Sequence, residues 1–262
     1  MRVDSSVVKR VILLLAVLCR CQTDDSLDSQ LGDLGRVSFS YQRSCFFGCP
    51  LAQPLLSGTR EQIAVTGAGD GRGVHAKSSD ADVAEFALER DCFCERDDDV
   101  GGRIEVAEDA RCEAPRVKHC DNAILVQAKA AGDVSLELRD EHDRLIDRAT
   151  LLVRDAERAR FRGTRASQLG AREADSFELR TGETLDLELT LFDARGRALL
   201  APEAVHWQSS EPSLASVSAF LRPGGAELDA GLEVVVTGRA AGTATVRVTV
   251  PGLEASVECE VR

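Results

Sequence analysis

Strict alternation of apolar and polar residues marks three stretches near the C-terminal end of the chain. They span residues 184–191, 243–250 and 253–262. A period of two is typical of a β-strand that has one buried face and one solvated face. The residues predicted to face inward are Leu185, Leu187, Leu189, Leu191, Ala244, Val246, Val248, Val250, Leu253, Ala255, Val257, Cys259 and Val261. Strands of this kind need a second sheet to cover their apolar faces, which predicts a β-sandwich.

Three short motifs lie among these strands. They are Gly182-Glu-Thr184, Trp207-Gln-Ser-Ser-Glu-Pro212 and Ala241-Gly-Thr-Ala244. In this order they resemble the motifs of group 2 bacterial immunoglobulin-like domains. The resemblance implies an immunoglobulin-like sandwich and a role in adhesion or assembly at the cell surface. The chain departs from the family's pattern between Ala219 and Leu232, where Pro223-Gly-Gly225 adds a hairpin signal to a loop.

The same motifs recur, in diverged form, earlier in the chain. The matched pairs are residues 57–65 with the stretch from Thr181, 77–86 with 208–217, and 126–135 with 236–245. Ser78 to Ala130 spans 52 positions, whereas Ser209 to Ala240 spans 31, so the first copy holds 21 extra residues. We therefore predict an internal repeat.

The predicted fold is all-β, with two immunoglobulin-like sandwich domains in tandem after a signal peptide and a flexible tether. The first domain covers residues 36–157 with a cysteine-rich insertion at 89–122, and the second covers 158–262. The alternation in residues 158–162 predicts the first strand of the second domain. A helical or loose linker is the alternative there.

The leader resembles that of a bacterial lipoprotein. Basic residues precede the apolar run 11–18, and Cys19 follows that run directly. The run is too short to span a membrane, so residues 1–21 are predicted to be a secretory leader, followed by a tether over 22–35. Lipidation of Cys19 would anchor the protein to a membrane, and simple cleavage of the leader is the alternative. The predicted location is periplasmic or on the outer membrane or cell surface.

The cysteines agree with export. Six belong to the first domain and can pair in 15 ways, so their connectivity stays open. They are Cys45, Cys49, Cys92, Cys94, Cys112 and Cys120. Their spacing differs from the paired Cys-x-x-Cys of zinc sites, which favours disulfides. Cys259 alternates with inward residues and is expected to be a buried, inert thiol.

Charge and composition exclude several classes of function. The net charge of −12 argues against nucleic acid as a partner. Asp97-Asp-Asp99 is an acidic cluster, for which a solvated loop is the main interpretation and a calcium site the alternative. His119 lies beside Cys120, but adjacent residues of an extended segment point to opposite faces. We therefore predict no catalytic residue, no metal and no cofactor.

The function that these features favour is a non-enzymatic cell-envelope protein. It would present immunoglobulin-like domains for contact with an envelope or extracellular protein or a glycan, or would serve as a structural spacer. The alternative is an accessory protein of an exported hydrolase, or a carbohydrate-binding module, with its site in the cysteine-rich insertion. A carbohydrate site requires exposed aromatic rings, and Trp207 and Tyr41 are the candidates.

Overall fold

The computed structural model describes residues 30–42, 50–67, 73–95, 104–106, 111–112, 117–164, 172–173, 175–201, 205–219 and 232–262. All regular secondary structure in these residues is β-strand, so the all-β prediction is confirmed. Within them, no helix is long and apolar enough to cross a membrane. The predicted leader, Cys19, Cys45, Cys49, Asp97-Asp-Asp99 and Pro223-Gly-Gly225 lie outside the described residues.

The N-terminal half of the chain forms two sheets, which we call the N-terminal sheet pair. The first has the strand order β1-β2-β4-β8-β6-β7 and the second has the order β3-β10-β9-β5. Their bounds are Gln30–Leu31 (β1), Ser38–Tyr41 (β2), Leu55–Leu56 (β3), Arg60–Thr66 (β4), His75–Ser78 (β5), Ala84–Glu95 (β6), Ile104–Val106 (β7), Val117–Ala128 (β8), Gly132–Arg139 (β9) and Leu145–Arg154 (β10).

The C-terminal half forms the C-terminal sheet pair. Its two sheets have the orders β12-β11-β14-β17-β16 and β13-β19-β18-β15. Their bounds are Arg158–Thr164 (β11), Arg172–Glu173 (β12), Ser176–Leu179 (β13), Thr184–Phe192 (β14), His206–Ser209 (β15), Ala215–Ala219 (β16), Glu233–Gly238 (β17), Gly242–Val250 (β18) and Leu253–Val261 (β19).

The two sheet pairs share one strand order. The order β2-β4-β8-β6 corresponds to β11-β14-β17-β16, and β3-β10-β9-β5 corresponds to β13-β19-β18-β15. Individual hydrogen bonds correspond as well: Gly58 N–H donates to the carbonyl of Ala128, and Gly182 N–H donates to that of Gly238. Both glycines have a positive φ, 81° and 84°, a conformation that suits glycine at this turn. The hydrogen bonds thus pair positions that the sequence comparison had paired.

Two apolar cores fill the sandwiches. In the C-terminal pair, the inward residues predicted on β14 and β18 are all buried. On β19, Val257, Cys259 and Val261 are buried, while Leu253 and Ala255 are only partly covered. Strand β11 confirms the prediction for residues 158–162, because Phe161 is buried and Arg158 and Arg160 are exposed.

The cores interlock where the two sheet pairs meet. Leu55 of β3 packs in the N-terminal core, whereas its neighbour Leu56 packs in the C-terminal core. Leu200, between β14 and β15, packs in the N-terminal core, while its neighbour Leu199 packs in the C-terminal core. The two segments run parallel: Leu56 N–H donates to the Leu200 carbonyl (2.8 Å), and Leu200 N–H donates to the Pro54 carbonyl (2.9 Å).

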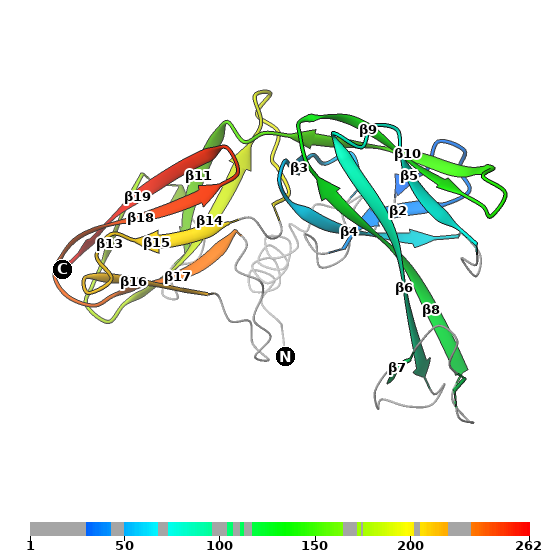
Figure 1. The fold of residues 1–262 in the computed structure, drawn as a ribbon. Coiled ribbons are helices and arrows are strands. Elements are labelled where there is room, and N and C mark those ends of the chain that lie inside the picture. Colours follow the sequence, from blue (N-terminus) through cyan, green and yellow to red (C-terminus); the bar gives the residue numbers. More distant parts are fainter. Residues whose placement is uncertain are drawn as a thin grey trace, which may run out of the picture.

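This leucine exchange is the joint of the molecule. Adjacent residues of an extended segment point to opposite sides, so each of the two segments can serve both cores at once. Gly58 adds a close approach, since a Cβ there would lie 2.9 Å from Cγ of Pro251, in the turn between β18 and β19. Figure 1 shows the two sheet pairs side by side around this region.

The predicted flexible tether over 22–35 is wrong for its last residues. Gln30–Leu31 forms β1 and pairs with β2. The carboxylate of Asp147 on β10 accepts hydrogen bonds from the backbone N–H groups of Leu34, Arg36 and Val37. The composition of the segment looks like that of a linker, but its backbone is held by Asp147, 110 to 113 positions away in the sequence.

The joint gives a direct prediction for stability. Replacing Leu200 with Ala is expected to lower the free energy of unfolding by about 2 to 5 kcal/mol, because Leu200 is 6% exposed and fills the other pair's core. Leu34→Ala is the matched control: Leu34 is 47% exposed, so its loss is expected to cost about 0.5 kcal/mol or less. Chemical denaturation measures both, and equal costs would contradict the interlocked joint.

Candidate functional site

A ribbon formed by β6 and β8 extends beyond the N-terminal sandwich (Figure 1). The two strands pair continuously from Ala84 opposite Ala128 to Glu95 opposite Val117. The predicted insertion at 89–122 is thus, in its described part, a continuation of two sandwich strands. Strand β7 pairs with β6 near the far end of the ribbon.

Disulfide chemistry holds this ribbon. Cys94 on β6 is bonded to Cys112, with their Cα atoms 5.6 Å apart. Cys92 is also disulfide-bonded. The backbone of Cys120 on β8 lies opposite that of Cys92 in the β6–β8 ladder, so a bond between Cys92 and Cys120 is a prediction from the strand register. Cys92 and Cys94 are buried, at 4% exposure each.

Cys259 and Tyr41 are titratable side chains buried inside the cores. Cys259 is a free, buried thiol. Burial, and secondarily Glu258, raises its pKa to about 11, which keeps it protonated and unreactive at neutral pH. Burial, with a smaller contribution from Glu61, also raises the pKa of Tyr41. The described residues include no group of three or more His, Cys, Asp or Glu that could hold a metal ion.

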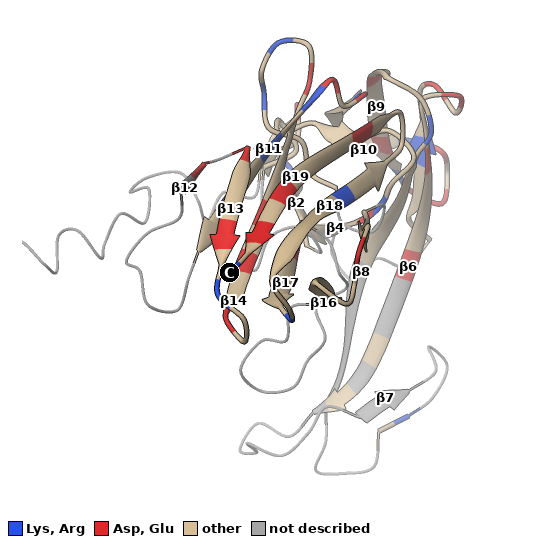
Figure 2. Ribbon diagram, turned by 90° about the vertical axis from the view of Figure 1, so that its left-hand side faces the viewer, with Lys and Arg blue, Asp and Glu red and all other residues tan. Residues whose placement is uncertain are grey.

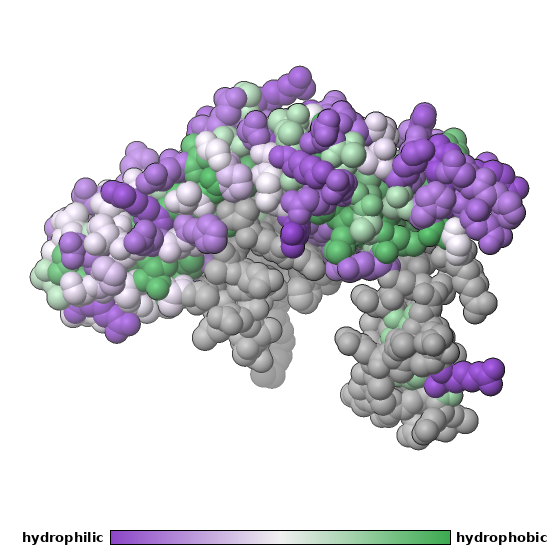
Figure 3. Space-filling view, viewed as in Figure 1, coloured by the Kyte–Doolittle hydropathy of each residue, from purple (hydrophilic) through white to green (hydrophobic). Residues whose placement is uncertain are grey.

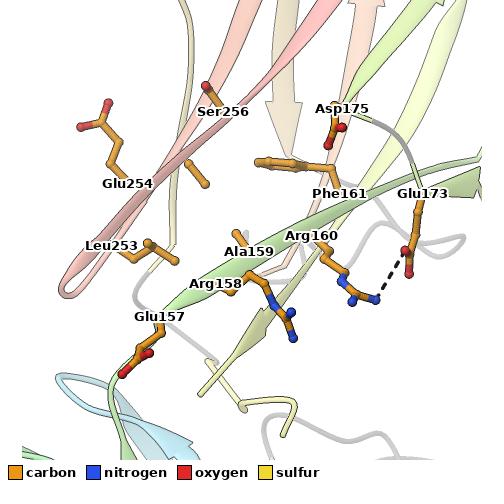
Figure 4. A pocket seen from close by; sticks show the side chains of 11 residues that line it. Glu157, Arg158, Ala159, Arg160, Phe161, Glu173, Asp175, Leu253, Glu254 and Ser256 are labelled. Atoms are coloured by element: carbon orange, nitrogen blue, oxygen red, sulfur yellow. Dashed lines mark ion pairs between the residues drawn. The ribbon is translucent and has the colours of Figure 1, made fainter. Parts of the chain in front are cut away.

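A groove of about 430 Å³ opens between β11 and β19, one strand from each sheet of the C-terminal pair (Figure 4). Its floor is apolar and consists of Ala159, Phe161, Leu253 and Ala255. Phe161 is further held by an edge contact with Trp207, with ring centroids 6.1 Å apart. The groove is therefore a shallow slot between two sheets of one sandwich, with a few apolar side chains among charged ones.

Charged side chains surround the groove. Arg160 forms an ion pair with Glu173 (3.5 Å). Arg158 and Arg160 also lie over the ring of Phe192, at 5.0 and 5.1 Å from its centroid. Four carboxylates line the rim, from Glu157, Glu173, Asp175 and Glu254. Figure 2 marks further acidic residues in red along β13 and β19.

Strand edges flank the groove on both sides. In the described residues, β12 pairs with the outer edge of β11 at Arg162 and Gly163, which leaves residues 158–161 of that edge without a strand. Likewise β13 pairs with β19 at residues 258–261, and residues 253–257 have no described strand on that edge. An edge without a partner strand presents backbone N–H and C=O groups that can pair with another strand.

The corresponding opening of the N-terminal pair is closed by the chain itself. Arg154 and Arg262 occupy equivalent positions in the two sheet pairs. The Arg154 carbonyl accepts a hydrogen bond from Ser57 N–H, and the Arg262 carbonyl accepts one from Thr181 N–H. Counting back along β10 and β19, Asp147 then corresponds to Ala255 and Arg148 to Ser256.

Residues 30–37 lie across that equivalent opening. On one side, Gln30 pairs with Phe39 of β2, the counterpart of Phe161. On the other side, Asp33 N–H donates to the Arg148 carbonyl of β10 (2.8 Å). We call residues 30–37 the closing segment. It joins the edges of both sheets at the place where the C-terminal pair has its groove.

A second hollow, of about 510 Å³, lies over β4, β6 and β8. It is lined by Ala87 and Leu125, with Arg60, Glu85 and Gln127 around them. Figure 3 shows apolar surface over these strands. It lies on the face of one sheet, so it offers no strand edges of the kind that flank the groove.

No sequence motif predicted the groove. None of its lining residues was a predicted site residue. The alternation of β19 placed Leu253 and Ala255 inward, but it carries no information on whether a neighbouring strand covers them. A usable signal was the repeat itself: the second copy has no segment equivalent to residues 30–37.

Comparisons with known proteins add the following. No protein-family model and no curated protein matches the chain. Among solved structures, it is similar to domains 4 and 5 of the S-layer protein SbsC, with 18% identity and a TM-score of 0.29, over 52% of this chain and 68% of that one. It is also similar to the adhesin FdeC of Escherichia coli, with 14% identity and a TM-score of 0.28, over 91% of this chain and 66% of that one.

A glycosyl hydrolase family 2 member from Bacteroides cellulosilyticus is similar at 15% identity and a TM-score of 0.30, over 79% of this chain and 23% of that one. The chain likewise spans 22% of the SbsC fragment that contains domains 1–6, at 15% identity, a TM-score of 0.31 and 77% coverage of this chain. The function therefore has to be argued from the residues of this chain.

The ribbon yields a prediction on disulfide connectivity. Peptide mapping of the oxidised protein is expected to recover Cys94 linked to Cys112 and Cys92 linked to Cys120. Cys259 is expected to react with an alkylating reagent only after unfolding, because it is buried and its pKa is raised. Recovery of Cys92 linked to Cys112, or rapid alkylation of Cys259 in the native protein, would contradict the described arrangement.

The closing segment yields a prediction on pH. Burial alone would raise the pKa of Asp147, but the N–H donors from Leu34, Arg36, Arg148 and Val37 outweigh it, and the pKa is lowered. A lowered pKa means that the carboxylate contributes its stability above the unfolded value of about 3.9, and that this stability is lost as the pH falls further.

Asp147→Asn removes an acceptor and the charge. It is expected to lower the free energy of unfolding by about 1.5 to 3 kcal/mol at pH 7, with the difference from wild type shrinking below about pH 4. Asp82→Asn is the control, since Asp82 is exposed and its side chain holds no backbone segment. Denaturation curves across pH measure the gap. A gap that is independent of pH would show that the charge of Asp147 plays no part.

Proposed function

We propose that this chain is an exported, non-enzymatic cell-envelope protein whose two immunoglobulin-like units, residues 36–157 and 158–262, act as one stiff body for contact with another protein. The observation that carries the proposal is the leucine exchange at the joint. Because Leu56 and Leu200 each fill the other unit's core, bending at the joint would expose apolar surface at about 25 cal/mol per Å². Such a body holds its outer surfaces at a fixed spacing.

The resemblance to group 2 bacterial immunoglobulin-like domains forms part of this proposal. The motif Gly182-Glu-Thr184 lies in the turn that leads into β14, and Trp207 to Pro212 runs from β15 toward β16. The third motif, Ala241-Gly-Thr-Ala244, starts β18. These positions support the resemblance because the motifs fall at strand starts and turns of one sandwich, where sequence constrains the backbone most.

Export is supported by cysteine chemistry. The bond between Cys94 and Cys112, together with the bonded state of Cys92, requires an oxidising compartment. In the proposal, residues 1–21 are the leader and Cys19 carries a lipid that anchors the protein to the membrane. The location would then be the periplasm or the cell surface.

Protein contact is favoured over sugar binding by the placement of the aromatic rings. Sugar sites stack their ligands on exposed rings, whereas Tyr41 is fully buried and Trp207 packs against the C-terminal core. The groove offers strand edges and an apolar floor, which suit a polypeptide. The alternative of a hydrolase accessory protein has no observation of this kind in its favour.

The proposal is tested by fractionation of the native cells. The full-length protein is expected in the membrane fraction, to incorporate a labelled fatty acid, and to be accessible to added protease or antibody once the envelope is opened. Cys19→Ser is expected to lose the label and the membrane association, whereas Cys21→Ser, the matched control, keeps both. A protein found in the cytoplasm with reduced Cys94 and Cys112 would overturn export, and an unlabelled exported protein would overturn the anchor alone.

A further inference from the structure

The groove between β11 and β19 is an incomplete edge of its sandwich. The N-terminal pair has the same strand order, and there the closing segment joins the edge of β2 to the edge of β10. The C-terminal pair offers the equivalent edges, at residues 158–161 and 253–257, without a described strand on either. A strand-shaped position that is filled in one copy thus has no strand from the described residues in the other.

The geometry points to an extended segment of a partner protein as the occupant of this groove: we propose that a strand with alternating apolar and basic residues docks there. The claim deepens the proposed role in protein contact and rests on it. The strand would pair its backbone with the edges of β11 and β19. Every second side chain would face the floor formed by Ala159, Phe161, Leu253 and Ala255.

The charge of the groove rim determines which residues are expected at the outward-facing positions of the docked strand. Four carboxylates line the groove against two arginines, both of which lie over Phe192; Glu173 is paired with Arg160 and Glu254 with Arg247. Among the described residues Glu157 and Asp175 form no ion pair. Lysine or arginine at the outward positions of the docked strand would pair with these carboxylates and speed its association.

A second copy of the closing segment fits the groove less well. In its own sandwich that segment is fixed by the carboxylate of Asp147, which accepts three of its backbone N–H groups. The equivalent residue on β19 is Ala255, whose methyl group accepts no hydrogen bond. The groove therefore selects a straight strand with apolar side chains over the looped closing segment.

Synthetic peptides test the proposal on the full-length chain. The probe is a capped peptide of about eight residues, roughly 26 Å when extended, in which Val and Lys alternate. The first control is a peptide of the same composition in which all Val residues precede all Lys residues. The second control is a peptide in which Val and Glu alternate. We expect saturable binding of the alternating basic peptide alone, with amide chemical-shift changes centred on residues 158–161 and 253–257, and affinity that falls with added salt.

Two variants locate the site. Ala255→Trp fills the floor and is expected to weaken binding by about tenfold or more, while Thr249→Trp, on the exposed face of β18 in the same hairpin, leaves it unchanged. The double variant Glu157→Lys and Asp175→Lys reverses the rim charge without entering the core, and is expected to turn the preference toward the acidic peptide. Thermal unfolding of each variant establishes that it is folded.

Several results would overturn the inference. They are no saturable binding of the alternating basic peptide up to about 1 mM, equal binding of the block peptide, or unchanged affinity in both groove variants. Concentration-dependent shifts of the same amides without peptide would assign the groove to a second copy instead. None of these results bears on export or on the lipid anchor, so failure here is distinct from failure of the proposed function.

Discussion

The structure depends on an exchange of leucines between two cores. A sandwich of about a hundred residues buries only a modest apolar surface of its own, so each large side chain counts in its stability. Here Leu56 is covered by the core of the C-terminal pair and Leu200 by the core of the N-terminal pair, along two parallel segments joined by backbone hydrogen bonds. The joint resembles the interior of one domain more than a linker between two.

The two halves differ in how they complete the same strand order. In the N-terminal pair the chain forms β1 and is fixed by the carboxylate of Asp147 before it enters β2. In the C-terminal pair the chain arrives directly from β10 and enters β11 after three residues. Three residues are too few to lie across the edge as the closing segment does in the N-terminal pair. Connection length, rather than a difference in core residues, distinguishes the two.

Much of the fold could be predicted from the sequence because one side of each strand is buried. The alternation predicted β11, β14, β18 and β19. The repeated motifs matched positions in the two halves that form equivalent hydrogen bonds. The joint was missed because Leu55-Leu56 and Leu199-Leu200 are doublets, which violate a period of two. A doublet in a short extended segment indicates burial on both faces, and this is the signal that would have identified the joint. The closing segment was missed because its polar composition gives no sign of a partner as distant as Asp147.

The leucine exchange also has a consequence for how such a protein evolves. A recombination event that cut the gene near residue 157 would leave Leu56 without its cover and would open a hole in the C-terminal core where Leu56 had been. The other fragment would carry Leu200 outward onto its surface. Either half, once joined to a new protein, would thus have an exposed apolar patch and a cavity. Recombination that separates the two sandwiches is therefore expected to be less well tolerated than recombination that moves them together.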